Sequence, residues 1–425
     1  MPNLIEIMKV LIKQAHIICQ GSPHNNSIKD IFISDGIIQK IDDHIDVQAD
    51  QIVSYDNLHV SIGWMDVFAH FSDPGHEERE TIETGAAAAA AGGFTDVMIM
   101  PNTNPVLAAK SQIEYIKQRS RQLAVNIHPI GAVTKNAEGK ELAEMYDMYE
   151  SGAVAFSDGL NSIQQANIMT KALQYVLAND KVIIQLPDEK SISAHGLVNE
   201  GIVSTKMGLP GKPAIAEELM IMRDIELLKY TGSKLHITGI STRKSVELIA
   251  AAKKSGLQIT CSATPYHCYF SDEDLAEYDT NLKVNPPLRN QDDKTAIREA
   301  LNNGTIDCIA SHHIPLNWDD KTCEFEYAKY GMTGLESVFS VFNSIFINLE
   351  HLINHLTTHP RNIFGIAMPR IEENANACLT LFQPEETYTF EASQIRSKAR
   401  NNPFIGKQLE GKVIGIINNG KFVAH

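Results

Sequence analysis

The chain has 425 residues, and 37 Lys and Arg against 52 Asp and Glu give it a formal net charge of −15. At about 150 residues per domain, this length predicts two or three domains. The acidic balance argues against nucleic acid as a partner, because binding phosphates requires clustered basic side chains. With 43% hydrophobic and 21% charged residues, the composition is that of a globular protein and excludes a disordered chain.

The N-terminal segment, MPNLIEIMKVLIKQAHIIC, is apolar but is interrupted by Glu6, Lys9 and Lys13 and lacks a small-residue cleavage site. It therefore predicts no signal peptide. No run approaches the roughly 20 apolar residues of a membrane-spanning helix, so we expect no membrane association. The six cysteines form neither a CxxC pair nor a disulfide-type spacing. These features favour a cytoplasmic protein with buried thiols.

Two kinds of sequence pattern occur along the chain. Residues 9–60 consist of short apolar segments separated by Gly, Asn and Asp, which indicates β-strands. From Gly63 onward, about eight apolar runs alternate with helical stretches, as in a (β/α)₈ barrel. The predicted helices are Thr84–Ala91, Ser111–Leu123, Ile163–Leu177, Ala214–Tyr230, Lys244–Ser255 and Asp292–Asn303.

After residue 365 the chain returns to β-like segments, and Asn418–Gly420 is a typical hairpin turn. Because chain ends often lie close together, the two β-rich ends are expected to form one domain. We predict an α/β protein, with a (β/α)₈ TIM barrel beside a small β-sandwich. The predicted limits are residues 1–60 and 366–425 for the β domain and 61–365 for the barrel.

The first barrel strand leads into DVFAHFSDPGHEERE at residues 66–80, followed by MPNTNP at 100–105. These motifs resemble those of the metal-dependent cyclic amidohydrolases, and within them the dihydroorotases of the long bacterial type. Further matching segments are GAVAFSDG, STRKSVELI, NLKVNPPLR, GTIDCIAS and NPFIGKQLEGKV. The resemblance covers nearly the whole chain and implies the amidohydrolase barrel with a metal centre at the C-terminal ends of its strands.

Several metal-ligand positions of that family carry other residues here. The resemblance implies two histidines after the first strand, where this chain has Phe68 and His70. The fourth strand keeps a bridging carboxylate, Asp158. Gln185 and Gly239 stand where the fifth and sixth strands of the family provide histidines. Phenylalanine and glycine offer no side-chain donor, and a glutamine amide is a poor replacement for imidazole.

The base and the substrate contacts differ as well. His312 occupies the position of the family's catalytic aspartate, which activates the metal-bound water. Ser72 and Leu316 replace the arginine and histidine that hold the substrate carboxylate, while Asn102 and Asn285 remain as substrate-binding remnants. Because these replacements coincide at the strand ends, we predict an intact scaffold without the binuclear metal centre.

Three functions follow as alternatives. The first is a catalytically inactive dihydroorotase-like protein of pyrimidine biosynthesis, with no catalytic residue and no cofactor. The second is an active dihydroorotase or other cyclic amide hydrolase with one zinc ion on His70, Asp158 and His312, a plausible mononuclear donor set. The third is a binding protein that holds a small ligand through Asn102 and Asn285 without chemistry.

The resemblance also bears on assembly. Some family members that lack the metal ligands are non-catalytic partners of aspartate transcarbamoylase, which makes that enzyme the expected partner of an inactive chain. The family further implies a homodimer. The sequence itself identifies neither interface.

Overall fold

The computed structural model describes residues 8–425 and contains two large sheets. The start of the segment predicted not to be a signal peptide lies outside the described residues. Eight parallel strands form the first sheet, in which each strand pairs with the next along the chain. They are β6 (Trp64–Ala69), β7 (Phe94–Ile99), β8 (Asn126–Gly131), β9 (Ala155–Phe156), β10 (Ile183–Gln185), β13 (Leu235–Thr238), β14 (Ile259–Ala263) and β15 (Cys308–Ile309).

A parallel bridge between Ala69 and His313 joins the first and last strands, and the His70 amide donates to the His313 carbonyl at 2.8 Å. The sheet is thereby closed into a barrel. Helices surround it: α1 (Ile82–Ala91), α2 (Lys110–Ser120), α3 (Met145–Glu150), α4 (Ala166–Val176), α7 (Ile215–Thr231), α8 (Arg243–Lys254), α10 (Gln291–Asn302), α12 (Val338–Asn343), α13 (Leu349–Leu356) and α14 (Thr358–Phe364).

Helix α8 illustrates how the sequence sets these elements. The Thr242 hydroxyl accepts a hydrogen bond from the Ser245 amide and caps the helix N-terminus. Ile249 and Ala252 are buried on one face, and lysines occupy the last turn, where positive charge is favourable. Each of the six predicted helices is present, with ends shifted by a few residues.

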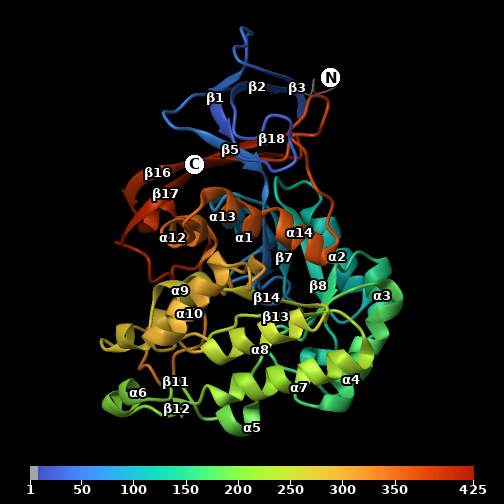
Figure 1. Ribbon diagram of the computed structural model, residues 1–425, viewed down its shortest axis with the longest axis vertical. Helices are drawn as coiled ribbons and strands as arrows, with labels where there is room; N and C mark the ends of the chain where they lie inside the picture. Colours follow the sequence, from blue (N-terminus) through green and yellow to red (C-terminus); the bar gives the residue numbers. More distant parts are fainter. Residues whose placement is uncertain (1–7) are drawn as a thin grey trace.

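The two chain ends build the second large sheet, shown in blue and red at the top of Figure 1. From one end of the chain come β1 (Lys9–Ile17), β2 (Ile28–Ser34), β3 (Ile37–Asp42), β4 (Gln51–Val53) and β5 (His59–Ile62); from the other, β16 (Leu379–Thr389), β17 (Gln408–Asn418) and β18 (Lys421–Ala424). Strand β5 pairs with β16 and joins the two ends. The predicted barrel with a separate β domain is confirmed, while the limits given for the domains stay a prediction.

Short elements lie in the connections that follow barrel strands β10, β14 and β15. They are the two-stranded sheet of β11 (Val198–Asn199) and β12 (Gly211–Lys212), and the helices α5 (Lys190–Ser193), α6 (Ile202–Met207), α9 (Pro265–Tyr269) and α11 (Trp318–Lys321). No helix among residues 8–425 is long and apolar enough to cross a membrane.

Candidate functional site

The centre of the barrel face is occupied by His312, which follows β15 and has a φ of +45°. Its Nε2 lies 2.8 Å from the Thr238 hydroxyl, and its Nδ1 lies 3.3 Å from the Tyr266 hydroxyl. The Phe68 ring packs against the imidazole with 4.8 Å between centroids. His312 is 1% exposed and Phe68 is 0% exposed. The two replacements found in the sequence are therefore in contact and fill the same space.

Gly239 makes room for His312. A Cβ on Gly239 would lie 2.7 Å from His312 Cε1 and 3.4 Å from Leu186 Cδ1, and the glycine has a φ of +68°. A histidine at this position, as the family pattern has it, would collide with His312. Gln185 turns away from the centre, because its Nε2 donates to Asp224 on α7 at 3.2 Å. Leu186 thus faces Gly239 while Gln185 faces the helix layer.

His70 is held by its neighbours on both ring nitrogens. Its Nε2 is 2.9 Å from the Asn102 carbonyl and its Nδ1 is 3.1 Å from the Ser72 hydroxyl. Burial lowers the pKa of His70 to about 4, so the imidazole is neutral at physiological pH. Ser72 is itself buried and bonded to this ring.

Asp158 is directed at the loop after β8. The Thr134 amide and hydroxyl donate to its two carboxylate oxygens at 2.8 and 2.5 Å, and the Gly139 amide adds a third bond at 3.2 Å. Asn102 supports the same region through bonds to the Asp158 carbonyl and the Leu160 amide, at 3.0 and 2.9 Å. Asp158 and Asn102 therefore tie adjacent loops together.

The hydrogen bonds of His70, Asp158 and His312 determine whether these side chains are free to bind a metal ion. Each of His70, Asp158 and His312 has its donor atoms bonded to other groups, and within residues 8–425 no cluster of three or more His, Cys, Asp or Glu side chains is arranged to hold a metal ion. Phe68 adds an apolar wall at one ligand position. The donor set and its arrangement do not fit the family's binuclear centre.

His312 stands where the family pattern has its catalytic aspartate. Burial, together with the nearby His267 and His236, lowers its pKa to about 3. The imidazole is neutral near pH 7 but accepts a proton only weakly.

The other half of the barrel face carries charge. Lys212 on β12 donates to Asp188 Oδ2 at 2.7 Å and to Asn285 Oδ1 at 2.5 Å. Lys212 and Asp188 are 7% and 5% exposed. Burial lowers the pKa of Lys212, whereas the neighbouring Asp188 carboxylate raises it. The structure thus places Asn285 on a buried ion pair, away from the bonds made by Asn102.

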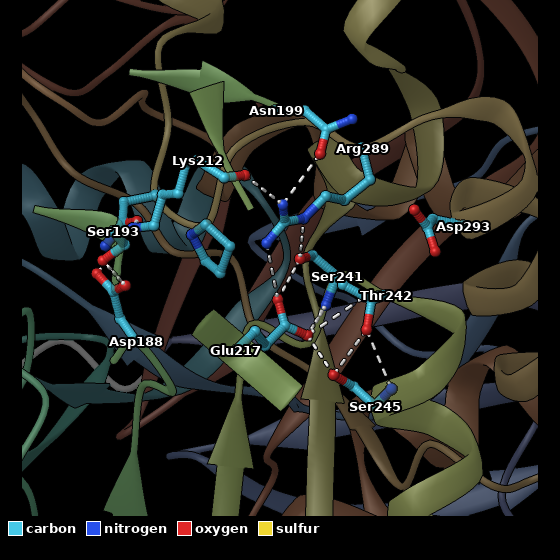
Figure 2. Close-up of polar contacts among 12 residues, drawn as sticks. Asp188, Ser193, Asn199, Lys212, Glu217, Ser241, Thr242, Ser245, Arg289 and Asp293 are labelled. Carbon is cyan, nitrogen blue, oxygen red and sulfur yellow. Dashed lines mark hydrogen bonds and ion pairs between the residues drawn. The ribbon is translucent and has the colours of Figure 1, made fainter. Parts of the chain in front are cut away.

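Arg289 forms the second part of this charged region. Figure 2 shows its guanidinium directed at Glu217 and Ser241, with Asn199 and the Lys212 carbonyl accepting on the opposite side. Arg289 Nη2 lies 3.6 Å from Glu217 Oε2, and both side chains are almost completely buried.

Glu217 accepts further bonds from the start of α8. The Ser241 amide donates at 2.8 Å, the Thr242 amide at 3.3 Å and the Ser245 hydroxyl at 2.7 Å. Sequence analysis assigned no role to Lys212, Glu217 or Arg289. Glu217 lies in the predicted helix Ala214–Tyr230 and Arg289 ends the matching segment NLKVNPPLR, but neither position by itself indicates a buried ion pair.

Three other histidines of family motifs have structural contacts. His236 is bonded to the Thr260 and Ser262 hydroxyls, and His267 to the Thr264 hydroxyl and the Pro286 carbonyl. His313 Nδ1 accepts from the Gly334 amide at 3.2 Å. These bonds satisfy His236 and His267, whose burial would otherwise be costly, whereas His313 Nε2 is buried without a hydrogen bond and lies 3.5 Å from Glu80 Oε2.

The chain is similar in sequence to a known family and to several of its members. The family model described as "Dihydro-orotase-like" matches residues 59–245. The dihydroorotase of Caldanaerobacter subterraneus subsp. tengcongensis is 40% identical over 97% of both chains, and that of Pelotomaculum thermopropionicum is 41% identical over 98% of both.

Among solved structures, the L-hydantoinase (dihydropyrimidinase) from Arthrobacter aurescens superimposes with a TM-score of 0.84 and 24% identity, covering 98% of this chain and 96% of its own. That likeness supports the fold. The identity to curated relatives extends over both sheets and every strand of the barrel. The chain belongs to the dihydroorotase family.

Proposed function

We propose that this chain is a non-catalytic member of the dihydroorotase family that acts as a scaffold or subunit in pyrimidine biosynthesis. The packing of Phe68 against His312 at the barrel centre carries the proposal, because it puts an apolar ring and a buried, neutral imidazole where the family has a ligand and the base. The bonds of His70 and Asp158 to loop atoms support it. Sequence similarity alone cannot decide activity, because activity depends on the site residues.

The test is a zinc and activity measurement on the purified full-length protein. We expect less than one zinc per chain after dialysis and no dihydroorotate hydrolysis or carbamoyl aspartate cyclisation above the buffer rate, with zinc added. The Caldanaerobacter subterraneus dihydroorotase, handled in parallel, serves as the positive control. Two tightly held zinc ions with turnover would refute the proposal.

A remodelled hydrolase with one zinc ion is the second candidate. His70 and His312 are both neutral near pH 7, which is the form in which histidine binds metals. In that case the three remnant side chains must leave their present hydrogen bonds. His312→Ala should then abolish both zinc binding and hydrolysis of uncharged cyclic amides, whereas under the first proposal it changes neither.

The proposed scaffold needs a partner, and aspartate transcarbamoylase is the candidate that we carry forward, together with a homodimer of this chain in the cytoplasm. Support comes from the family membership and from the preserved fold. Light scattering after size-exclusion chromatography, with and without the aspartate transcarbamoylase of the same organism, tests both points. A single peak at the summed mass is expected, and two separate peaks at micromolar concentrations would contradict the partnership.

A further inference from the structure

A basic cavity is lined by the loops that follow the first, seventh and eighth barrel strands, β6, β14 and β15, and by the loop between β16 and β17. Its volume is about 450 Å³, within the usual range of small-molecule sites. The residues that matter here are Arg79, Asn281, Trp318, Lys321, Lys398 and Arg400. None of them carries a role in the site described above.

The charge of this cavity contrasts with that of the whole protein. Four cationic side chains and one carboxylate, that of Glu78, line it, whereas the chain as a whole has a formal net charge of −15. In the part of the chain described here, Lys321, Lys398 and Arg400 make no ion pair within 4.0 Å. A concave surface of one charge sign concentrates ligands of the opposite sign.

The cations are held in place by backbone carbonyls. Lys398 Nζ donates to the Glu77 carbonyl at 2.8 Å, and Arg400 Nη1 donates to the carbonyls of Ala392 and Ile395. Carbonyls position these groups without neutralising them. The full positive charge is therefore available to a ligand.

Lys321 contributes charge from inside the wall. It is 7% exposed, and its Nζ donates to the Thr280 and Lys329 carbonyls at 2.7 and 2.8 Å. A second buried lysine, Lys283, lies close by and is bonded to the Phe325 and Glu326 carbonyls. Burial, with the charge of Lys283, lowers the pKa of Lys321 to about 7. A bound anion would offset both the burial of Lys321 and its repulsion by Lys283, and would raise the pKa of Lys321.

Arg79 has unused hydrogen-bonding capacity. Its Nε is buried and has no hydrogen-bond partner. The nearest carboxylate oxygens, of Glu78 and Asp320, are each 3.7 Å from the guanidinium, beyond hydrogen-bond distance. Buried unpaired donors are uncommon in native proteins, and a guanidinium matches the geometry of phosphate oxygens.

Trp318 supplies the last element. It lines the cavity with 74% of its surface exposed, although a large aromatic side chain is usually mostly buried. An exposed indole beside basic groups can stack on a flat ring while the cations hold an attached anion.

We propose that this cavity binds a nucleoside polyphosphate, with its phosphates on Arg79, Lys398 and Arg400 and its base on Trp318. The loops after strands 7 and 8 of a TIM barrel are a frequent location of phosphate sites. The site does not include the barrel centre, so it stands whether or not the chain is catalytic. The cavity is lined by Leu316, which stands at the family's substrate-carboxylate position, but by none of His70, Asp158 and His312.

Tryptophan fluorescence provides a direct measurement, because the chain has two tryptophans and the other, Trp64, is fully buried. Titration of the full-length protein with UTP and ATP should quench the Trp318 emission and give saturable binding by calorimetry. Inorganic phosphate and uridine are titrated separately, to test the phosphate part and the nucleoside part of the ligand. Both should bind at least about tenfold more weakly than the triphosphate, because each lacks one set of contacts.

Two variants decide the assignment. Lys398→Ala/Arg400→Ala should weaken triphosphate binding at least about tenfold, since charge-assisted bonds are lost. The control Lys140→Ala/Lys244→Ala removes the same charge at exposed sites outside the cavity and should change the affinity by less than about twofold. Trp318→Phe should remove the fluorescence response. It should also weaken the binding of the triphosphate more than the binding of inorganic phosphate.

The proposal is overturned if calorimetry detects no triphosphate binding at millimolar concentration, or if the control pair weakens binding as much as the cavity pair. Equal affinity for inorganic phosphate and UTP would overturn the nucleotide assignment. Circular dichroism of each variant verifies that it is folded, and both cavity positions are solvent-exposed.

Discussion

The two halves of the barrel face differ in how they keep polar groups buried. Around His312, the contacts are an aromatic ring, two hydroxyls and a glycine, and the imidazole is neutral. Around Arg289, a guanidinium and a carboxylate are buried together with several backbone and hydroxyl partners. The first half is held by packing and by hydrogen bonds of a neutral ring, whereas the second holds paired charges.

This difference shows which interactions the scaffold needs. The Glu217–Arg289 pair joins the start of α8 to the loop before α10 and to β12, so its loss affects several elements. The metal ligands of a barrel centre instead serve a bound ion, and other side chains can fill their space if volume is preserved.

Removing one member of the charged pair should have the largest effect. Glu217→Ala leaves the Arg289 guanidinium buried without a counter-charge and should destabilise the protein by about 3–5 kcal/mol. Urea unfolding followed by circular dichroism measures this. Glu247→Ala, which removes an exposed carboxylate on α8, is the control and should leave the midpoint nearly unchanged. Similar midpoints for both variants would show that the pair is dispensable.

Changing the neutral centre should have a moderate effect. Gly239→Ala combines an unfavourable positive φ with a 2.7 Å approach to His312 and should cost about 1–3 kcal/mol. Gly232→Ala is a matched control, because its φ is also +68° but no atom lies within 4 Å of the added Cβ. The difference between the two variants reports the contact alone. If the two losses are equal, the centre is not tightly packed.

At neutral pH the smallest effect is that of His312 protonation, which grows as the pH is lowered. His312 has a folded-state pKa of about 3 against an ordinary value of 6.5, so between these values the unfolded chain binds the extra proton. Its neutral burial therefore contributes stability that falls as pH is lowered from about 6.5 towards 3.

His312→Gln should reduce the slope of stability against pH in this window by up to about 1.4 kcal/mol per pH unit. Chemical denaturation at several pH values between 4 and 7 measures the slope. The exposed His195, changed to Gln, controls for loss of a surface imidazole. An unchanged slope in the His312 variant would mean that this ring is not kept neutral by the fold.

Most of the fold follows from the sequence pattern. The alternation of apolar runs with amphipathic stretches predicts the barrel, and the hairpin at Asn418–Gly420 appears between β17 and β18, where Asn419 and Gly420 have positive φ values. The replaced positions at Phe68, Gly239 and His312 were also visible in the sequence. The alternation and the hairpin are local features that require only the periodicity and the identity of the residues, whereas the replacements are recognised only through the resemblance to the family.

The orientation of side chains at the strand ends depended on the tertiary structure. Asp158 has the chemistry of a metal ligand, but the fold directs it to Thr134. Asn285 matches a substrate-binding position of the family, but in the structure its side-chain oxygen accepts a hydrogen bond from Lys212. Arg79 and Trp318 are 239 residues apart in the sequence and line one cavity. Sequence determined which groups are present, whereas chain closure decided which of them meet, because hydrogen bonds and ion pairs act over a few ångströms between segments that are distant along the chain.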